Sequence, residues 1–216
     1  MSMPELPEVT VNRFMQSYGL SENTALLLVS DPSFVNFYEN AVEACCGELK
    51  SFHTAQVAPS VANWMTNDLF FLIKETFGDV EDDELNLVKS CRISPAQLGQ
   101  IVALVLEESV STRGAKNTLL VLYKEEPEAL PRDIVRKRGW QLIKDPKALR
   151  QIADQVVHDP GNAKQLHQYL IGGKKQIKME KLFLGKAMNV ANGNAHPELL
   201  QKAVGESLSR IKARQL

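Results

Sequence analysis

Apolar residues recur with a helical period along most of the chain. After Ser94 five apolar positions follow the spacing i, i+3, i+4, i+7 and i+8: Leu98, Ile101, Val102, Val105 and Leu106. A shorter version of the spacing follows two aspartates, at Phe34, Phe37, Tyr38 and Ala41, and at Leu149, Ile152, Ala153 and Val156. No window alternates apolar and polar residues with a period of two between turn signals. The pattern predicts an all-α protein with about ten helices.

Helix boundaries are marked by capping residues and prolines. A capping side chain stands directly before proline at Asp31-Pro32, Ser94-Pro95, Asp145-Pro146 and Asp159-Pro160. Gln97 follows Ser94 by three residues, which completes a capping box. Asn192-Gly193-Asn194 is predicted to end a helix, and His196-Pro197 to begin the last one. The acidic stretch from Gly78 to Glu84 is predicted to be a loop.

Charge and linker signals divide the chain into segments. Residues 1–90 carry 4 Lys and Arg against 14 Asp and Glu, whereas residues 131–216 carry 17 against 7. The segment from Glu125 to Pro131 holds two prolines and three glutamates, and the sign of the charge changes there. We therefore predict a short lead over residues 1–30, a helical body over residues 31–130 and a small basic helical domain over residues 131–216. A basic domain next to an acidic body suggests a binding face for an anionic partner, although charged faces can also be merely solvated.

The sequence contains no motif for a membrane span, for nucleotide binding, for nucleophilic catalysis or for metal and redox chemistry. The longest apolar run, Ile101 to Leu106, has six residues, against the ~20 that a membrane-spanning helix needs. The chain has no glycine fingerprint for nucleotides, no P-loop and no nucleophile elbow. Cys45, Cys46 and Cys91 lack the spacing of a metal or redox motif, which favours inert thiols in a reducing compartment. We therefore assign no catalytic residue, no metal ligand and no cofactor to this chain.

Basic residues concentrate in residues 171–216, and seven positions there form the predicted binding site. On a helix from about Lys178, positions 178, 181 and 185 share one face. Gly185 has no side chain, so it permits either the close approach of a phosphate or close packing of another helix. The region has few aromatics for stacking on bases, which favours contact with a polyanion backbone over base reading. The predicted site consists of Lys174, Lys175, Lys178, Lys181, Gly185, Lys186 and Lys202.

The same region resembles a known family. The segment Leu182-Phe-Leu-Gly-Lys-Ala-Met188, followed by Gly193-Asn-Ala-His-Pro197, is similar to the closing motif of the YqeY-type domain, which ends the B subunit of the glutamyl-tRNA(Gln)/aspartyl-tRNA(Asn) amidotransferase. Further segments resemble this B subunit in the same order along the chain: Leu6-Pro-Glu with Tyr18-Gly-Leu20, Trp64 to Leu69, Thr112 to Leu119, and Asp133 to Gly139. The resemblance covers almost the whole chain.

The resemblance implies a function for the chain as the tRNA-binding tail of this B subunit. It implies that residues 1–30 connect to a catalytic core, which this chain lacks and which would bind ATP and Mg²⁺. The complete enzyme, a carbon–nitrogen ligase, would convert Glu-tRNA(Gln) or Asp-tRNA(Asn) to the amide with glutamine and ATP. Implied partners are tRNA, the amidotransferase A subunit, which releases ammonia from glutamine, and a small third subunit, with no membrane. The implied compartment is the mitochondrial matrix in a eukaryote or the cytoplasm in a bacterium.

Two alternatives remain open from the residues alone. The chain could be a free-standing YqeY-like helical protein, although the Pro-Glu-Leu-Pro lead resembles a connector that such a protein does not need. It could also be a helical adaptor whose basic face binds an acidic protein. Binding to tRNA, compared with capture of acidic proteins, distinguishes these interpretations.

Overall fold

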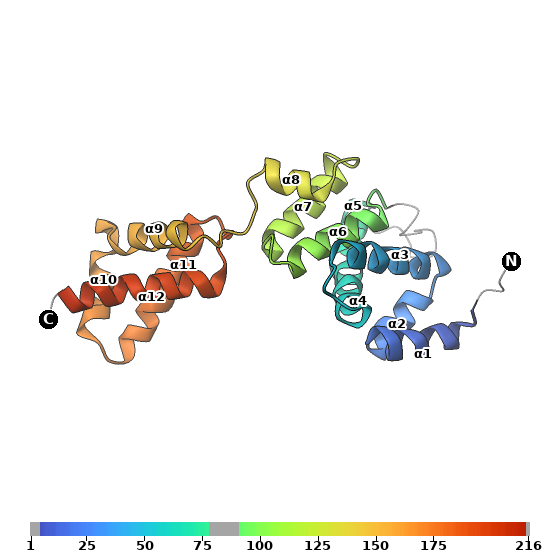
Figure 1. Cartoon of the computed structure of the whole chain (residues 1–216), viewed down its shortest axis with the longest axis horizontal. Coiled ribbons are helices and arrows are strands. Elements are labelled where there is room, and N and C mark those ends of the chain that lie inside the picture. Colours follow the sequence, from blue (N-terminus) through green and yellow to red (C-terminus); the bar gives the residue numbers. More distant parts are fainter. Residues whose placement is uncertain (1–4, 78–90, 215–216) are drawn as a thin grey trace. The chain divides into compact units, whose positions relative to one another are not determined.

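A computed structural model describes residues 5–77 and 91–214, and the described chain is helical with no β-strand (Figure 1). The all-α prediction is confirmed. The predicted loop from Gly78 to Glu84 lies outside the described residues. The chain divides into two compact units, residues 1–139 and residues 140–216, which we call unit 1 and unit 2.

Unit 1 contains eight α-helices and one π-helical segment within its described part. These are α1 (Pro7–Tyr18), α2 (Glu22–Val29), α3 (Pro32–Glu48), α4 (Thr54–Asn63), the π-helix η1 (Trp64–Leu69), α5 (Phe70–Phe77), α6 (Pro95–Leu106), α7 (Thr112–Lys124) and α8 (Pro131–Lys137). The helix starts agree with the predicted caps. Ser94 Oγ accepts from the Gln97 N–H at 3.2 Å, and Gln97 Oε1 accepts from the Ser94 N–H at 2.9 Å.

The core of unit 1 is built around the crossing of α3 and α6. Phe37, Tyr38 and Ala41 on α3 are buried, as are Leu98, Ile101 and Val102 on α6. Gly99 lies at the closest approach, since a Cβ built there would be 2.6 Å from the carbonyl oxygen of Ala41. The helical spacing therefore identified the buried face of α3 correctly. On α6 it identified Leu98, Ile101 and Val102, but Val105 and Leu106 are only partly buried, and Ala103 and Leu104 are buried as well.

The boundary between the units falls after Gly139, whereas the sequence placed the basic domain from residue 131. The reason is that α8 packs on α6 and α7 through Ile134 and Val135, which are buried. The proline-rich segment before α8 is also tied to α6, because Gln97 Nε2 donates to the carbonyl oxygens of Pro127 at 2.7 Å and Ala129 at 3.0 Å.

Unit 2 is a small helical bundle. It contains α9 (Pro146–Val157), a 3-10 turn η2 (Pro160–Asn162), α10 (Ala163–Ile171), α11 (Lys174–Val190) and α12 (Pro197–Arg214). Asp159-Pro160 therefore begins a 3-10 turn, not an α-helix. The turn after α11 contains Asn192 and Gly193 at positive φ, as the predicted stop requires. Its core includes Leu149, Phe183, Leu200 and Leu208, so Phe183 is a core residue and not a stacking platform.

Two sets of polar contacts hold unit 2 together. Asp154 Oδ1 on α9 accepts from Ser207 Oγ at 2.5 Å and from Arg210 Nη2 at 2.8 Å, both on α12. Ile143, before α9, donates its N–H to the Asn194 carbonyl at 2.7 Å and accepts from the His196 N–H at 3.0 Å. These contacts hold α9 and α12 together around the core. Helix α11 packs its apolar side on the same core, so its polar side faces solvent.

Candidate functional site

Helix α11 carries six of the seven predicted site residues. Its apolar side is buried through Met179, Phe183 and Ala187. Lys175, Lys178 and Lys181 are exposed. Because an α-helix turns 100° per residue, positions 178, 181 and 185 lie on the face opposite the core. We give the name lysine face to these three positions together with Lys175, which is exposed in the first turn of the helix. Lys174 begins α11, and its side chain lies outside the described residues.

Gly185 lies at the C-terminal end of the lysine face and is exposed. A Cβ built at this position would meet no atom of the described chain within 4 Å. Of the two roles considered for this glycine, packing against another helix of the described chain is therefore excluded. Glycine inside a helix costs roughly 0.5–1 kcal/mol relative to alanine. The bare backbone here thus has no structural use within the described chain that would offset this cost.

Lys186 has a different environment from the exposed lysines. It is half-buried, and its ammonium group donates to Oδ1 of the buried Asn162. Asn162 in turn donates from Nδ2 to the carbonyl oxygen of Val156 at 2.7 Å. Lys186 therefore holds η2 against α11, and part of its hydrogen-bonding capacity is used inside unit 2.

The turn that leads into α11 adds a second source of positive potential. Gly172 and Gly173 have φ of 81° and 73° with ψ near −160°, a backbone region that only glycine adopts readily. No side chain of the described residues caps the N-terminus of α11. Its first-turn N–H groups carry partial positive charge, which reinforces Lys175 and Lys178.

Lys202 lies apart from the other predicted residues, on α12. It lines a hollow of about 260 Å³ between the start of α9 and α12, together with Lys144, Pro146, Leu149, Arg150, Leu199, Ala203 and Glu206. Arg150, Leu199 and Glu206 were not predicted as site residues. No sequence pattern identifies them, because α9 and α12 meet only in the folded bundle.

Cations of α8 are paired with carboxylates of unit 1, whereas unit 2 carries an excess of positive charge. In unit 1, Arg132 pairs with Glu48 at 3.0 Å, Lys137 with Glu126 at 3.1 Å and Arg138 with Glu125 at 2.8 Å; α8 therefore places its cations against acidic partners of the same unit. Residues 140–216 carry 13 Lys and Arg against 6 Asp and Glu. The excess positive charge of the C-terminal half thus belongs to unit 2, without the contribution of α8.

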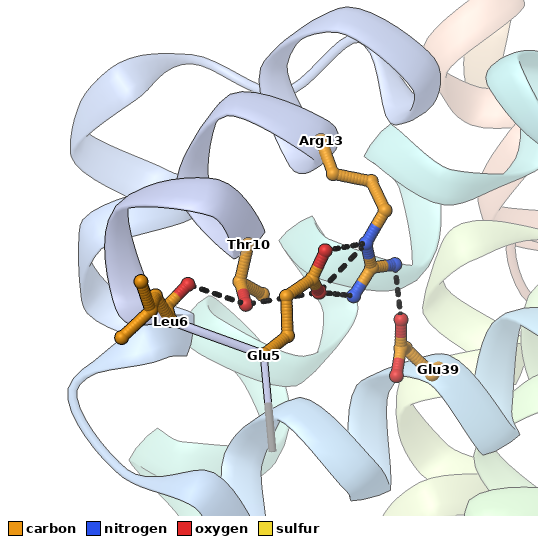
Figure 2. Close-up of polar contacts among 5 residues, drawn as sticks. All are labelled: Glu5, Leu6, Thr10, Arg13 and Glu39. Atoms are coloured by element: carbon orange, nitrogen blue, oxygen red, sulfur yellow. Dashed lines mark hydrogen bonds and ion pairs between the residues drawn. The ribbon is translucent and has the colours of Figure 1, made fainter. Parts of the chain in front are cut away.

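A second ion cluster of unit 1 lies at its N-terminal edge and has a structural role (Figure 2). Arg13 on α1 donates from Nη2 to Glu5 Oε2 at 2.7 Å and from Nη1 to Glu39 Oε1 on α3 at 2.5 Å. The Thr10 hydroxyl donates to Glu5 at 3.1 Å. The hydrogen bond from Arg13 lowers the pKa of Glu5, and that bond raises the pKa of Arg13. The cluster fastens the predicted lead segment to α3, a contact that spans 26 residues of sequence.

Two of the thiols, Cys45 and Cys91, have raised pKa values, and the described residues offer no candidate metal cluster. Burial raises the pKa of Cys45 to about 12 and that of Cys91 to about 11, so both thiols are protonated at neutral pH. Residues 5–77 and 91–214 contain no cluster of three or more His, Cys, Asp or Glu side chains suited to a metal ion. Within the same residues, no helix is sufficiently long and apolar to span a bilayer.

Comparison with known proteins gives one consistent match. A family model described as the GatB domain matches residues 43–208. The mitochondrial B subunit of the glutamyl-tRNA(Gln) amidotransferase of Phytophthora infestans is 30% identical over 211 residues, which are 97% of this chain and 33% of the relative. The chloroplastic/mitochondrial B subunit of Sorghum bicolor is 29% identical over 208 residues, with 96% and 33% covered. The B subunit of the aspartyl/glutamyl-tRNA(Asn/Gln) amidotransferase of a Ruegeria species is 26% identical over 206 residues, with 95% and 36% covered. The chain spans about a third of the length of these relatives.

Proposed function

Because the chain belongs to the GatB domain family, we propose that it is the tRNA-binding part of a tRNA amidotransferase B subunit. The relatives are named for Glu-tRNA(Gln) or for both Asp-tRNA(Asn) and Glu-tRNA(Gln) substrates. In this proposal the assembled enzyme converts the misacylated tRNA to its amide with glutamine and ATP. The chain contributes by holding tRNA, and it works with the amidotransferase A subunit and a small third subunit in an organelle or a bacterial cytoplasm.

The lysine face of α11 is the observation that carries the proposal. Three exposed lysines precede a glycine whose Cβ position is open, and the uncapped start of the same helix lies beside Lys175 and Lys178. A phosphate can approach the helix backbone more closely at Gly185 than it could if this position carried a side chain. The ammonium groups of Lys181 and Lys178, about one and two helical turns before Gly185, would neutralise the phosphates next to the close contact.

The chemistry of this face suits positioning of tRNA and not reading of its bases. Contacts with phosphates fix the register and orientation of a nucleic acid but carry no direct sequence information. Folded RNA is recognised largely through its shape and its backbone. A chain with this face would hold the body of a tRNA while another part of the enzyme acts on the aminoacyl end.

The activation chemistry belongs elsewhere in this proposal. The described residues supply no carboxylate cluster for Mg²⁺. The sequence also has no P-loop and no glycine fingerprint for a nucleotide. The part of the relatives that the match does not cover is where we place ATP binding and transfer of ammonia.

Salt-dependent binding of a tRNA(Gln) transcript tests the proposal. Fluorescence anisotropy is measured at several salt concentrations for the full chain and for the variant Lys175→Glu/Lys178→Glu/Lys181→Glu. If three phosphate contacts are lost, the slope of log K against log salt should become less steep by roughly 2–3 units, at ~0.7–0.9 for each phosphate. Affinity at low salt should fall by about tenfold or more. A non-cognate tRNA should lose affinity to a similar extent, because backbone contacts do not depend on sequence.

A matched control keeps the change in charge constant. The variant Lys50→Glu/Lys74→Glu/Lys124→Glu alters three exposed lysines of unit 1 and should keep at least most of the affinity. Circular dichroism should show unchanged helicity in both variants. Full-strength tRNA binding by the lysine-face variant would remove α11 from the interface. Binding that does not depend on salt, together with capture of acidic proteins, would favour the adaptor interpretation.

A further inference from the structure

The hollow beside Lys202 combines an apolar floor with charged side chains around it. Its floor is apolar, from the side chains of Pro146 and Leu149 on α9 and of Leu199 and Ala203 on α12. Its polar members are three cations and one carboxylate: Lys144, Arg150, Lys202 and Glu206. Leu199 is 40% exposed, so apolar surface is accessible here within a basic domain. Such surface is stabilised by covering it with another apolar or aromatic group.

The size of the hollow limits what can occupy it. Its volume of about 260 Å³ is far more than the ~30 Å³ share of one water molecule. It lies slightly below the roughly 300–1,000 Å³ range of small-molecule sites. A volume of this size accommodates a group of about one ring system.

The charges around the hollow indicate an anionic occupant with hydrogen-bond donors on its ring. The closest approach between Arg150 and Glu206 is 3.9 Å, between Nη2 and Oε2, and more than half of the Arg150 side chain is exposed. At this distance the guanidinium is not held in a tight bidentate pair, and its plane is available to stack on a ring. Lys202 provides a point charge for a phosphate, and the Glu206 carboxylate can accept from an amino group.

We infer that the hollow between α9 and α12 takes one unstacked nucleotide of a bound RNA. The inference rests on the proposed function and names a second contact for the same ligand. The base lies on Leu149, Leu199 and Ala203, and Arg150 covers it. The phosphate of that nucleotide contacts Lys202. Glu206 accepts from an exocyclic amino group, so cytosine is preferred to uracil, which has none.

Nucleotide titrations followed by methyl NMR test the site directly. The full chain, labelled at Leu and Ala methyl groups, is titrated with CMP, UMP and inorganic phosphate. CMP should shift the methyl signals of Leu149, Leu199 and Ala203 with half-saturation in the millimolar range. UMP should bind at least about threefold more weakly. Inorganic phosphate should leave these methyl signals unchanged, because it does not occupy the apolar floor.

Variants connect the nucleotide site to tRNA binding. Arg150→Ala should abolish the CMP shifts and weaken binding of the tRNA(Gln) transcript by roughly 5- to 150-fold, the usual range for the loss of one stacked base. Its matched control is Lys147→Ala, an exposed cation on the same helix outside the hollow, which should leave the CMP shifts intact. Glu206→Gln should reduce the preference for CMP over UMP without lowering helicity.

The outcomes separate this inference from the proposed function. If neither CMP nor UMP shifts the methyl signals, and Arg150→Ala binds tRNA at full strength, the nucleotide site is wrong while the lysine face remains a tRNA-binding surface. Shifts that persist unchanged in Arg150→Ala would also overturn it. If the chain binds no tRNA but CMP shifts the predicted methyl groups, the proposed function fails and the hollow is still a nucleotide site.

Discussion

Substitution of Gly185 by alanine should stabilise the protein and weaken its binding to tRNA. The two effects have opposite signs because they arise from different states of the molecule. A Cβ at position 185 meets nothing within 4 Å in the described chain, so the folded helix accepts alanine without strain. Removing a glycine from a helix interior stabilises it by about 0.5–1 kcal/mol. For a chain of this length the melting temperature should rise by about 1–4 °C.

The effect on binding follows from the same geometry with a ligand in place. If a phosphate contacts the backbone at Gly185, the new methyl group occupies part of the space that the ligand uses. Overfilling a close contact costs about 1–3 kcal/mol. This cost corresponds to a Kd for tRNA that is roughly 5- to 150-fold higher. The slope of log K against log salt should change little, because the lysines remain.

Gly205 on α12 provides a matched control for both measurements. It also lies inside a helix, and its Cβ position is open within the described chain. Gly205→Ala should therefore raise the melting temperature by a similar amount and leave tRNA affinity unchanged. Melting is followed by circular dichroism, and affinity by fluorescence anisotropy. Equal tRNA affinities of Gly185→Ala and the unaltered protein would refute the close approach at Gly185. A lower melting temperature for Gly185→Ala would refute the reasoning about the helix.

Three further changes test the scaffold. Gly99→Ala should destabilise unit 1 by about 1–3 kcal/mol in urea unfolding, because the new Cβ would be 2.6 Å from the carbonyl oxygen of Ala41; an unchanged urea midpoint would contradict this helix crossing. Cys45 should react slowly with thiol reagents at pH 8, because burial raises its pKa to about 12; rapid labelling of the folded protein would show that it is not buried. Arg13 lowers the pKa of Glu5, so the stability from this pair should be present above the ordinary value near 4.5 and be lost as pH falls through the lowered pKa. Glu5→Gln should reduce that loss in urea titrations at pH 3 and pH 7, and an unchanged pH dependence would contradict it.

Local signals in the sequence predicted much of the fold because they act over a few residues. The capping box at Ser94 and the stop at Asn192-Gly193 depend on backbone groups within one helical turn, and both are present in the structure. The buried face of α3 follows from periodicity alone, whereas α6 also buries Ala103 and Leu104 because other helices cover it on more than one side. The division between the units was harder to predict, because it depends on whether Ile134 packs on α6 and α7 or on the helices that follow.

The candidate site was predictable only in part, for the same reason. Periodicity placed Lys178, Lys181 and Gly185 on one face, since these positions belong to a single helix. It could not show that Lys186 reaches the buried Asn162, which comes from η2 and lies 24 residues away in sequence. The role of Arg150 was equally hidden, because the hollow exists only where α9 and α12 meet.

Arginine makes several of the ion pairs of unit 1, beside the lysine pairs Lys137–Glu126 and Lys116–Asp68, whereas the cations of the proposed binding surface on α11 are all lysines. Arginines make ion pairs that hold helices together, as Arg13, Arg132 and Arg138 do in unit 1. The planar guanidinium suits carboxylates whose positions the fold fixes in advance. Helix α11 instead carries five lysines and no arginine. Lysine is a flexible point charge, which can follow a phosphate without demanding one geometry. A surface of lysines next to an exposed helix glycine therefore fits a nucleic acid that is recognised by the path of its sugar-phosphate backbone. The arginine of the hollow, Arg150 on α9, is instead suited to stacking on a flat ring.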